Sequence, residues 1–352
     1  MAAPASVLPI AIDAMGGDNA PSAIIDGALQ ACRELGVPVL LVGDEYLIRE
    51  ELDRHPDADT LPVTIHHASQ QVAMDEQPSQ VVRRKRDSSI WVATALVKDG
   101  KASAVVSAGN TGASMATALF LLGQIPGVER PAIATVMPTL FGPCLLLDVG
   151  ANVDCKPHHL LQFAIMGHIY VEGLLKRPTP KIGLLSIGEE ETKGNELTKQ
   201  AFKLLRDSPL NFIGNVEGRD IYVGSADVVV CDGFIGNVTL KVSEGLASTI
   251  LKLLKREIAG APFGKIGYFF LRGAFERFRK RVDYAEYGGA PLLGVNGVSI
   301  ICHGRSPARA IKNAVRVAVE CVRQELHRNI RAELERLHAD VDDAAPRSAG
   351  AS

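Results

Sequence analysis

Short apolar runs alternate with longer helix-like segments along most of this 352-residue chain, and this alternation constrains the fold more than any other feature. Runs that are apolar at successive positions are typical of strands covered by helices on both faces. The pattern therefore predicts an α/β fold, a three-layer α/β/α sandwich with a largely parallel sheet. The expected strands are 7–12, 37–42, 63–66, 102–106, 133–136, 145–149, 182–186, 228–231 and 298–302.

The helix-like segments complete this organisation. Pro21 suits the first turn of a helix, where no backbone donor is needed. We expect one α/β unit over residues 7–337, possibly divided into two lobes around a cleft, followed by a disordered polar tail over 338–352. The expected helices are 20–35, 80–98, 113–122, 157–175, 195–205 and 307–327.

Composition excludes several functional classes. The formal net charge is −2, so no global field attracts nucleic acid. The six cysteines show no Cys-x-x-Cys spacing, which favours a reduced compartment. Residues 1–6 lack the charged and apolar regions of a secretory signal, so we expect a cytoplasmic protein.

Small and polar residues cluster directly after several of the apolar runs. Small residues let backbone N–H groups approach a ligand closely, and a helix that begins there adds partial positive charge. Because open α/β sheets bind ligands beyond the ends of their strands, the clusters predict one anion-binding cleft. They are 13–18, 107–112, 148–152, 193–196 and 231–237.

Residues 244–284 break the alternation and predict a basic amphipathic helical hairpin with a turn at 260–264. One interpretation is a dimerisation hairpin whose apolar faces pack against a second copy. The other is contact with a membrane surface or an acidic protein partner. Both remain open. The residues expected to make the membrane or partner contact are Phe269, Phe270, Arg272, Arg277, Arg279, Lys280 and Arg281.

Taken in order, these motifs resemble those of the bacterial phosphate acyltransferase family of phospholipid synthesis (PlsX). The resemblance also includes the segments 288–297 and 303–306 and covers about residues 7–325. It implies a fold similar to that of phosphate acetyltransferases and of isocitrate and isopropylmalate dehydrogenases. It further implies a cytosolic homodimer at the inner face of the membrane that transfers a long acyl group from acyl carrier protein to inorganic phosphate. The acyl phosphate would serve a membrane-bound glycerol-3-phosphate acyltransferase.

The residues meet the chemical demand of that reaction without a protein nucleophile or a cofactor. Phosphate near neutral pH is itself a competent nucleophile, so catalysis rests on positioning and on donors aimed at the developing oxyanion. The expected phosphate-binding or substrate-binding residues are Asp13, Gly16, Gly17, Asp18, Gly109, Asn110, Thr111, Gly112, Asn152, Asp232, Arg305 and Ser306. Asp13, Asp148 and Asp232 would orient donors, since a carboxylate repels phosphate directly.

The expected catalytic residues are Lys193, Asn195, Asn237 and His303. Lys193 would neutralise phosphate or polarise the carbonyl, and His303 would protonate the departing thiolate. Each has a structural alternative: a solvated loop lysine, or asparagines that only cap helices. His158 and His159 follow Cys155, but adjacent histidines on one helix rarely point the same way, so no metal is expected.

Two other functions remain as alternatives. A nicotinamide-dependent dehydrogenase is disfavoured because no Gly-x-Gly-x-x-Gly follows the first strand. A non-catalytic scaffold that binds acyl carrier protein at the membrane would explain the basic hairpin, but it would not need the polar strand-end clusters.

Overall fold

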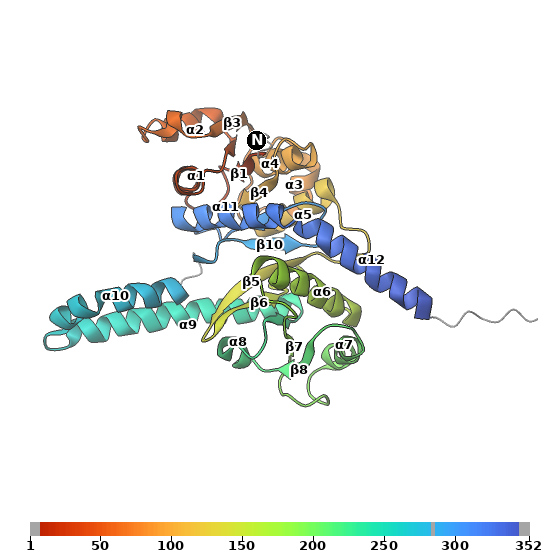
Figure 1. Ribbon diagram of the computed structural model, residues 1–352. Helices are drawn as coiled ribbons and strands as arrows, with labels where there is room; N and C mark the ends of the chain where they lie inside the picture. Colours follow the sequence, from red (N-terminus) through yellow and green to blue (C-terminus); the bar gives the residue numbers. More distant parts are fainter. Residues whose placement is uncertain (1–7, 283–285, 345–352) are drawn as a thin grey trace, which may run out of the picture.

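One 11-stranded sheet crosses the computed structural model, which describes residues 8–282 and 286–344 (Figure 1). Its strand order is β3-β2-β1-β4-β11-β10-β5-β6-β9-β7-β8. The strands are β1 (Ile10–Asp13), β2 (Val39–Gly43), β3 (Val63–His67), β4 (Ala104–Ser107), β5 (Ala132–Thr139), β6 (Gly142–Leu147), β7 (Ile182–Leu185), β8 (Phe212–Val216), β9 (Val228–Val230), β10 (Ala290–Leu293) and β11 (Ser299–Ile301).

The sheet consists of two parallel halves that run in opposite directions. Strands β3, β2, β1, β4 and β11 are parallel to one another, as are β6, β9, β7 and β8. Antiparallel pairing of β10 and β5 joins the halves. Strands β8 and β10 were not predicted, because Gly214 and Asn215 in one and Pro291 in the other depart from strand-like composition.

Helices cover both faces of the sheet, as predicted. Alternate residues of one strand, such as Leu145 and Leu147 against Leu146, enter separate apolar clusters on opposite faces. The helices are α1 (Ser22–Leu35), α2 (Glu45–Leu52), α3 (Pro78–Arg84), α4 (Ser89–Lys98), α5 (Thr111–Leu122), α6 (Pro157–Leu174), α7 (Glu196–Arg206), α8 (Asp220–Val223), α9 (Gly233–Gly260), α10 (Gly264–Val282), α11 (Ala308–Arg323) and α12 (Leu326–Ala344), with a 3-10 turn at Ala58–Thr60. The predicted three-layer α/β/α fold is confirmed.

The expected helix over 80–98 is interrupted between α3 and α4. Ser89 N donates to Gln70 O (3.1 Å), and the Asp87 carboxylate accepts from Ser69 N (3.0 Å). These bonds to the 69–70 loop replace the intrahelical bonds that the sequence pattern predicted.

Helix boundaries near the C-terminus also differ from the prediction. The expected helix over 307–327 ends at Arg323, because Glu325 adopts a positive φ of 46°. Helix α12 then continues to Ala344, beyond the start predicted for a disordered tail at residue 338. The sequence from 338 to 344 holds no Gly or Pro that would end a helix, and the first Pro follows at position 346.

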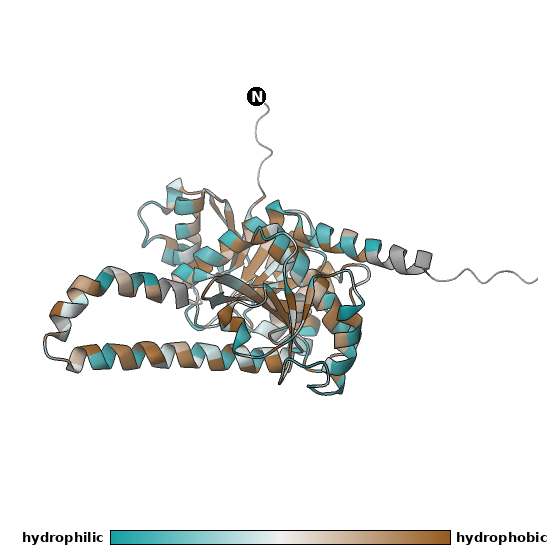
Figure 2. Cartoon of the chain, turned by 60° about the horizontal axis from the view of Figure 1, so that its bottom comes forward, coloured by the Kyte–Doolittle hydropathy of each residue, from teal (hydrophilic) through white to brown (hydrophobic). Residues whose placement is uncertain are grey.

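Helices α9 and α10 form the predicted hairpin, which projects from the body of the molecule (Figures 1 and 2). Helix α9 begins at Gly233, earlier than expected, because Asp232 Oδ1 accepts from Phe234 N (3.0 Å) and Ile235 N (2.9 Å). Hydrophobic and hydrophilic residues alternate along both helices (Figure 2). None of the described helices combines the length and apolarity that crossing a membrane requires.

Candidate active site

Three neighbouring loops meet at the carboxyl ends of β1, β4 and β11. The buried Asp13 carboxylate accepts from Ser107 Oγ (2.7 Å) and Met15 N (3.3 Å), and Ser107 Oγ accepts from Gly109 N (3.1 Å). Burial raises the pKa of Asp13, and hydrogen bonds, the largest from Ser89, partly offset that rise. Asp13 therefore holds two loops together, and its role in orienting donors toward phosphate stays a prediction.

Gly16 and Gly17 allow these loops to pack closely. A Cβ on Gly16 would overlap Asp13 Oδ2 and lie 2.8 Å from Gly109 N. Gly17 has a φ of 105°, and a Cβ there would lie 2.9 Å from Gly304 O. Gly109 N donates to Ser107 Oγ, and its binding of phosphate stays a prediction.

Asn110 is also engaged within the protein. Its Oδ1 accepts from Ala113 N (2.9 Å) and caps α5, while its Nδ2 donates to Met74 O (2.8 Å) and Glu76 O (2.9 Å). Both ends of the amide thus have partners within the protein, and the phosphate contact of this side chain stays a prediction. Thr111 and Gly112 open α5, and their binding of phosphate stays a prediction.

The 303–306 loop completes this first group. His303 Nδ1 accepts from Arg305 N (3.3 Å), so the neutral ring carries its proton on Nε2. Arg305 Nε forms an ion pair with Asp18 Oδ2 at 3.5 Å. Ser306 is buried, and its N donates to His303 O (2.9 Å). We call these three loops, 13–18, 107–112 and 303–306, the Asp13 group.

A second group of loops follows β6, β9 and β7. The buried Asp148 carboxylate accepts from Ile133 N (3.0 Å), Gly150 N (3.2 Å), Ala151 N (3.0 Å) and Asn152 N (2.7 Å). It also accepts from Asn152 Nδ2 (2.9 Å), which donates to Pro131 O (2.7 Å) as well. The amide nitrogen of Asn152 therefore joins two segments of the protein, and its contact with phosphate stays a prediction.

Burial raises the pKa of Asp148, while hydrogen bonds from Ala151 and Asn152 oppose the rise. The start of α9 packs on this carboxylate: Gly233 N donates to Asn152 O (2.7 Å), and a Cβ on Gly236 would overlap Asp148 O. Loops 148–152, 186–195 and 231–237 form what we call the Asp148 group.

Two of the polar residues in the Asp148 group cap helices. Asp232 caps α9 through its carboxylate, and Asn195 Oδ1 accepts from Thr198 N (2.9 Å) and caps α7. Lys193 is exposed, and its side chain lies beside Gly188. Ser186 was not among the predicted site residues; its buried hydroxyl has no hydrogen-bond partner in the part of the chain that the structure describes.

Helix α9 connects the two groups. A Cβ on Gly150 would lie 3.7 Å from Asn237 Cβ, so Asn237 faces the Asp148 group. One turn later, Lys241 Nζ pairs with Glu244 Oε2 at 3.0 Å. Leu240 of this turn packs against the apolar cluster that includes Ile301 at the end of β11. Burial lowers the pKa of His303, the charge of Lys241 lowers it further, and Glu244 opposes. The loops thus form two groups, one at the strand ends of each parallel half of the sheet, and their sharing of one cleft stays a prediction.

Glu129, His158 and His159 converge at the start of α6, which corrects the expectation that the two rings diverge. Glu129 Oε2 lies 2.8 Å from His158 Nε2 and 3.3 Å from His159 Nε2. However, His159 Nδ1 accepts from Lys156 N (3.0 Å), so the neutral ring is protonated at Nε2 and donates to Glu129. That nitrogen has no lone pair to offer a cation.

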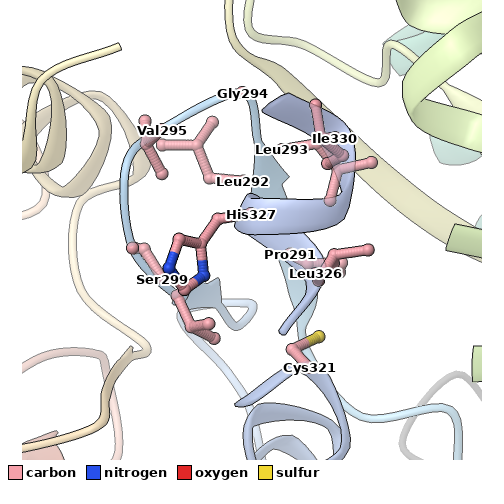
Figure 3. A pocket seen from close by; sticks show the side chains of 12 residues that line it. Pro291, Leu292, Leu293, Gly294, Val295, Ser299, Cys321, Leu326, His327 and Ile330 are labelled. Atoms are coloured by element: carbon pink, nitrogen blue, oxygen red, sulfur yellow. The ribbon is translucent and has the colours of Figure 1, made fainter. Parts of the chain in front are cut away.

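A small pocket of about 10 Å³ lies elsewhere, between β10 and the start of α12 (Figure 3). Leu292, Cys321, His327 and Ile330 line it together with neighbouring residues, and it contains none of the predicted site residues. Such a volume holds about one water molecule. The pocket is therefore too small for a phosphate or an acyl chain.

The hairpin presents exposed apolar side chains. Phe269 is 72% exposed and Phe270 is 78% exposed. Arg272 and Arg277 are exposed as well, and Arg272 Nε pairs with Glu276 Oε1 at 2.9 Å. The side chains of Arg279, Lys280 and Arg281 lie outside those that the structure describes.

Similarity to solved structures supports the fold. A phosphotransacetylase from Streptococcus pyogenes superposes with a TM-score of 0.58 at 16% identity, over 90% of this chain and 94% of that protein. A 4-hydroxythreonine-4-phosphate dehydrogenase from Klebsiella pneumoniae gives a TM-score of 0.52 at 14% identity, over 91% of this chain and 99% of that protein. The predicted likeness to phosphate acetyltransferases is thereby confirmed at the level of fold.

Sequence relatives are much more similar. A phosphate acyltransferase from Trichlorobacter lovleyi is 60% identical over 309 residues, covering 88% of this chain and 89% of that protein. One from Geobacter sulfurreducens is 55% identical over 326 residues, covering 93% and 94%. A family model described as "Fatty acid synthesis protein" matches residues 8–329. The chain therefore belongs to this family, that of the phosphate acyltransferases.

Proposed function

We propose that this chain transfers a long-chain acyl group from the thioester of acyl carrier protein to inorganic phosphate, and so supplies acyl phosphate for phospholipid synthesis. The observation that best supports this reaction is the position of Asn237. Its Cβ faces Gly150 of the Asp148 group. On the next turn of the same helix, Leu240 packs against the apolar cluster that contains Ile301, two residues before His303 of the Asp13 group.

The cysteines support a mechanism without a protein nucleophile. Burial raises the pKa of Cys144, Cys155 and Cys302 to about 12, and it raises the pKa of Cys231 well above its ordinary value. Since only the thiolate is an effective nucleophile, these groups are inert at neutral pH. Phosphate itself then attacks the thioester carbon.

In the proposed reaction a phosphate oxygen forms a bond to the acyl carbon, the carbon–sulfur bond breaks, and the thiolate of the carrier leaves. Lys193 and Asn237 stabilise the developing oxyanion, since donors aimed at that charge usually contribute most to catalysis. Asn195 supports the 193–196 loop through its cap. The thiol has a pKa near 8.5, so His303 Nε2–H assists its protonation only modestly.

The hairpin is the proposed contact with the carrier protein and the inner membrane surface. Its exposed Phe269 and Phe270 lie in the same helix as Arg272 and Arg277. Acyl carrier proteins are acidic, so a basic helix offers complementary charge. A homodimer formed through the apolar faces, with the tip free for the membrane and for the membrane-bound glycerol-3-phosphate acyltransferase, accommodates both sequence-based interpretations.

Phosphate-dependent thiol release from palmitoyl acyl carrier protein tests the reaction. We expect release by the purified chain, a strong loss in Lys193→Ala and Asn237→Ala, and normal rates in Lys101→Ala, which alters an exposed lysine before β4. Binding of the carrier protein without thiol release by the wild type would instead support a non-catalytic scaffold.

A further inference from the structure

Lys241 occupies a position that the sequence motifs did not single out. Residues four apart on a helix share a face, so Lys241 lies above Asn237 on α9. Asn237 approaches Gly150, and Leu240 of the next turn packs against the apolar cluster that contains Ile301, two residues before His303. Lys241 is therefore a cation between the two loop groups, on the helix that bridges them.

The four charged groups that act on His303 form two exposed ion pairs. Lys241 Nζ lies 3.0 Å from Glu244 Oε2, and Arg305 Nε lies 3.5 Å from Asp18 Oδ2. Exposed pairs of this kind contribute little to stability, so each cation exchanges its partner at low cost. A phosphate dianion attracts a cation more strongly than a single carboxylate does.

We propose that Lys241 is a substrate-binding residue whose ammonium group leaves Glu244 and contacts a phosphate oxygen between α9 and the 303–305 loop. The proposal rests on the proposed acyl transfer to phosphate and identifies a further residue for that site. Glu244 then competes with the substrate for the same ammonium group.

Two substrate groups carry phosphate oxygens that would fit this contact: inorganic phosphate, and the phosphodiester in the arm that holds the thioester on the carrier protein. The proposal commits to inorganic phosphate, and the KM values of the two substrates distinguish these groups. If Lys241 contacts inorganic phosphate, Lys241→Gln raises the KM for phosphate roughly tenfold, the effect of losing one charged hydrogen bond, while the KM for the acyl donor stays constant. A rise confined to the KM for the donor would overturn the assignment. Lys241→Arg should retain most of the affinity, and Lys98→Gln, at the exposed end of α4, serves as the matched control.

Glu244→Gln distinguishes substrate binding from a structural role. Removing the competing carboxylate frees Lys241, so the KM for phosphate should fall, opposite to the effect of Lys241→Gln. If the ion pair only stabilised α9, both variants would remove the same interaction and shift activity in the same direction. Equal rises in KM in the two variants would overturn the proposal.

Calorimetric titration of the full-length chain with inorganic phosphate keeps the inference testable even if thiol release fails. We expect binding by the wild type, weaker binding by Lys241→Gln and tighter binding by Glu244→Gln. Phosphate binding that is independent of Lys241 would refute the inference about this residue. Absence of thiol release together with Lys241-dependent binding would instead refute the proposed reaction.

Discussion

The Asp13 group and the Asp148 group are both organised by a buried aspartate, but the hydrogen-bond donors to the two carboxylates differ. In each, a buried aspartate at the end of a strand folds the following loop around its carboxylate. Asp13 accepts a short bond from the Ser107 hydroxyl, whereas Asp148 accepts from four backbone N–H groups and the Asn152 amide. A hydroxyl can turn and accept as well as donate, but a backbone N–H cannot. The Asp148 group is thus the less adaptable of the two, and it also anchors α9.

Replacing each aspartate by asparagine should give the largest difference in stability between the two loop groups. In Asp148→Asn the new amide group faces backbone N–H groups, which cannot accept from it, and we expect a loss of at least about 3 kcal/mol in the free energy of unfolding. Asp13→Asn should cost about 1 kcal/mol, because the Ser107 hydroxyl can accept from the new amide group. Urea denaturation of both variants measures the difference. Equal losses would show that the two aspartates tolerate the change alike.

The anchoring of α9 can be tested with two glycines of that helix. A Cβ on Gly236 would overlap Asp148 O, whereas one on Gly245 meets nothing within 4 Å. We expect Gly236→Ala to lower stability by about 2 kcal/mol and to displace Asn237, with a loss of thiol release. Gly245→Ala should raise stability by up to about 1 kcal/mol through helix propensity. Thermal unfolding and thiol-release assays compare the two variants. Equal stability and equal activity in Gly236→Ala and Gly245→Ala would contradict the anchoring of α9 at Asp148.

A smaller difference between the two groups is the pH dependence of stability. The Asp13 group contains His303, whereas the Asp148 loops contain no histidine in their sequence. The pKa of His303 in the folded chain lies below the ordinary 6.5, through burial and then the charge of Lys241, with Arg305 acting in the same sense and Glu244 and Asp18 opposing. Between those two pKa values the unfolded chain binds more protons, so stability falls as the pH decreases through this window.

We expect His303→Gln to flatten this dependence without abolishing it, since burial also lowers the pKa of His159 and His327. Urea denaturation between pH 5 and pH 8 measures the slope. A steeper slope in the variant would contradict the assignment of sign.

The sequence was informative wherever local chemistry decides structure. The apolar runs predicted the layers, and Asp232 and Asn195 carry the side chains of helix caps. It failed where distant contacts decide: bonds to the 69–70 loop interrupt the predicted helix at 85–88, and tertiary pairing makes a strand of Ala290–Leu293 despite its proline. Asn110 and Asn152 are of a residue type that suits phosphate binding, and the carbonyl groups that engage them come from other loops.

By itself the sequence determined the α/β class, the polar loops at strand ends, the amphipathic hairpin and the family, because these depend on residue type and spacing along the chain. Only the tertiary structure decided that the two parallel halves of the sheet run in opposite directions. It also decided that α9 extends between the loops of the two halves, so that the charge of Lys241 acts on His303. Strand order and helix direction depend on contacts between residues far apart in the chain, and no local pattern encodes which of those residues meet.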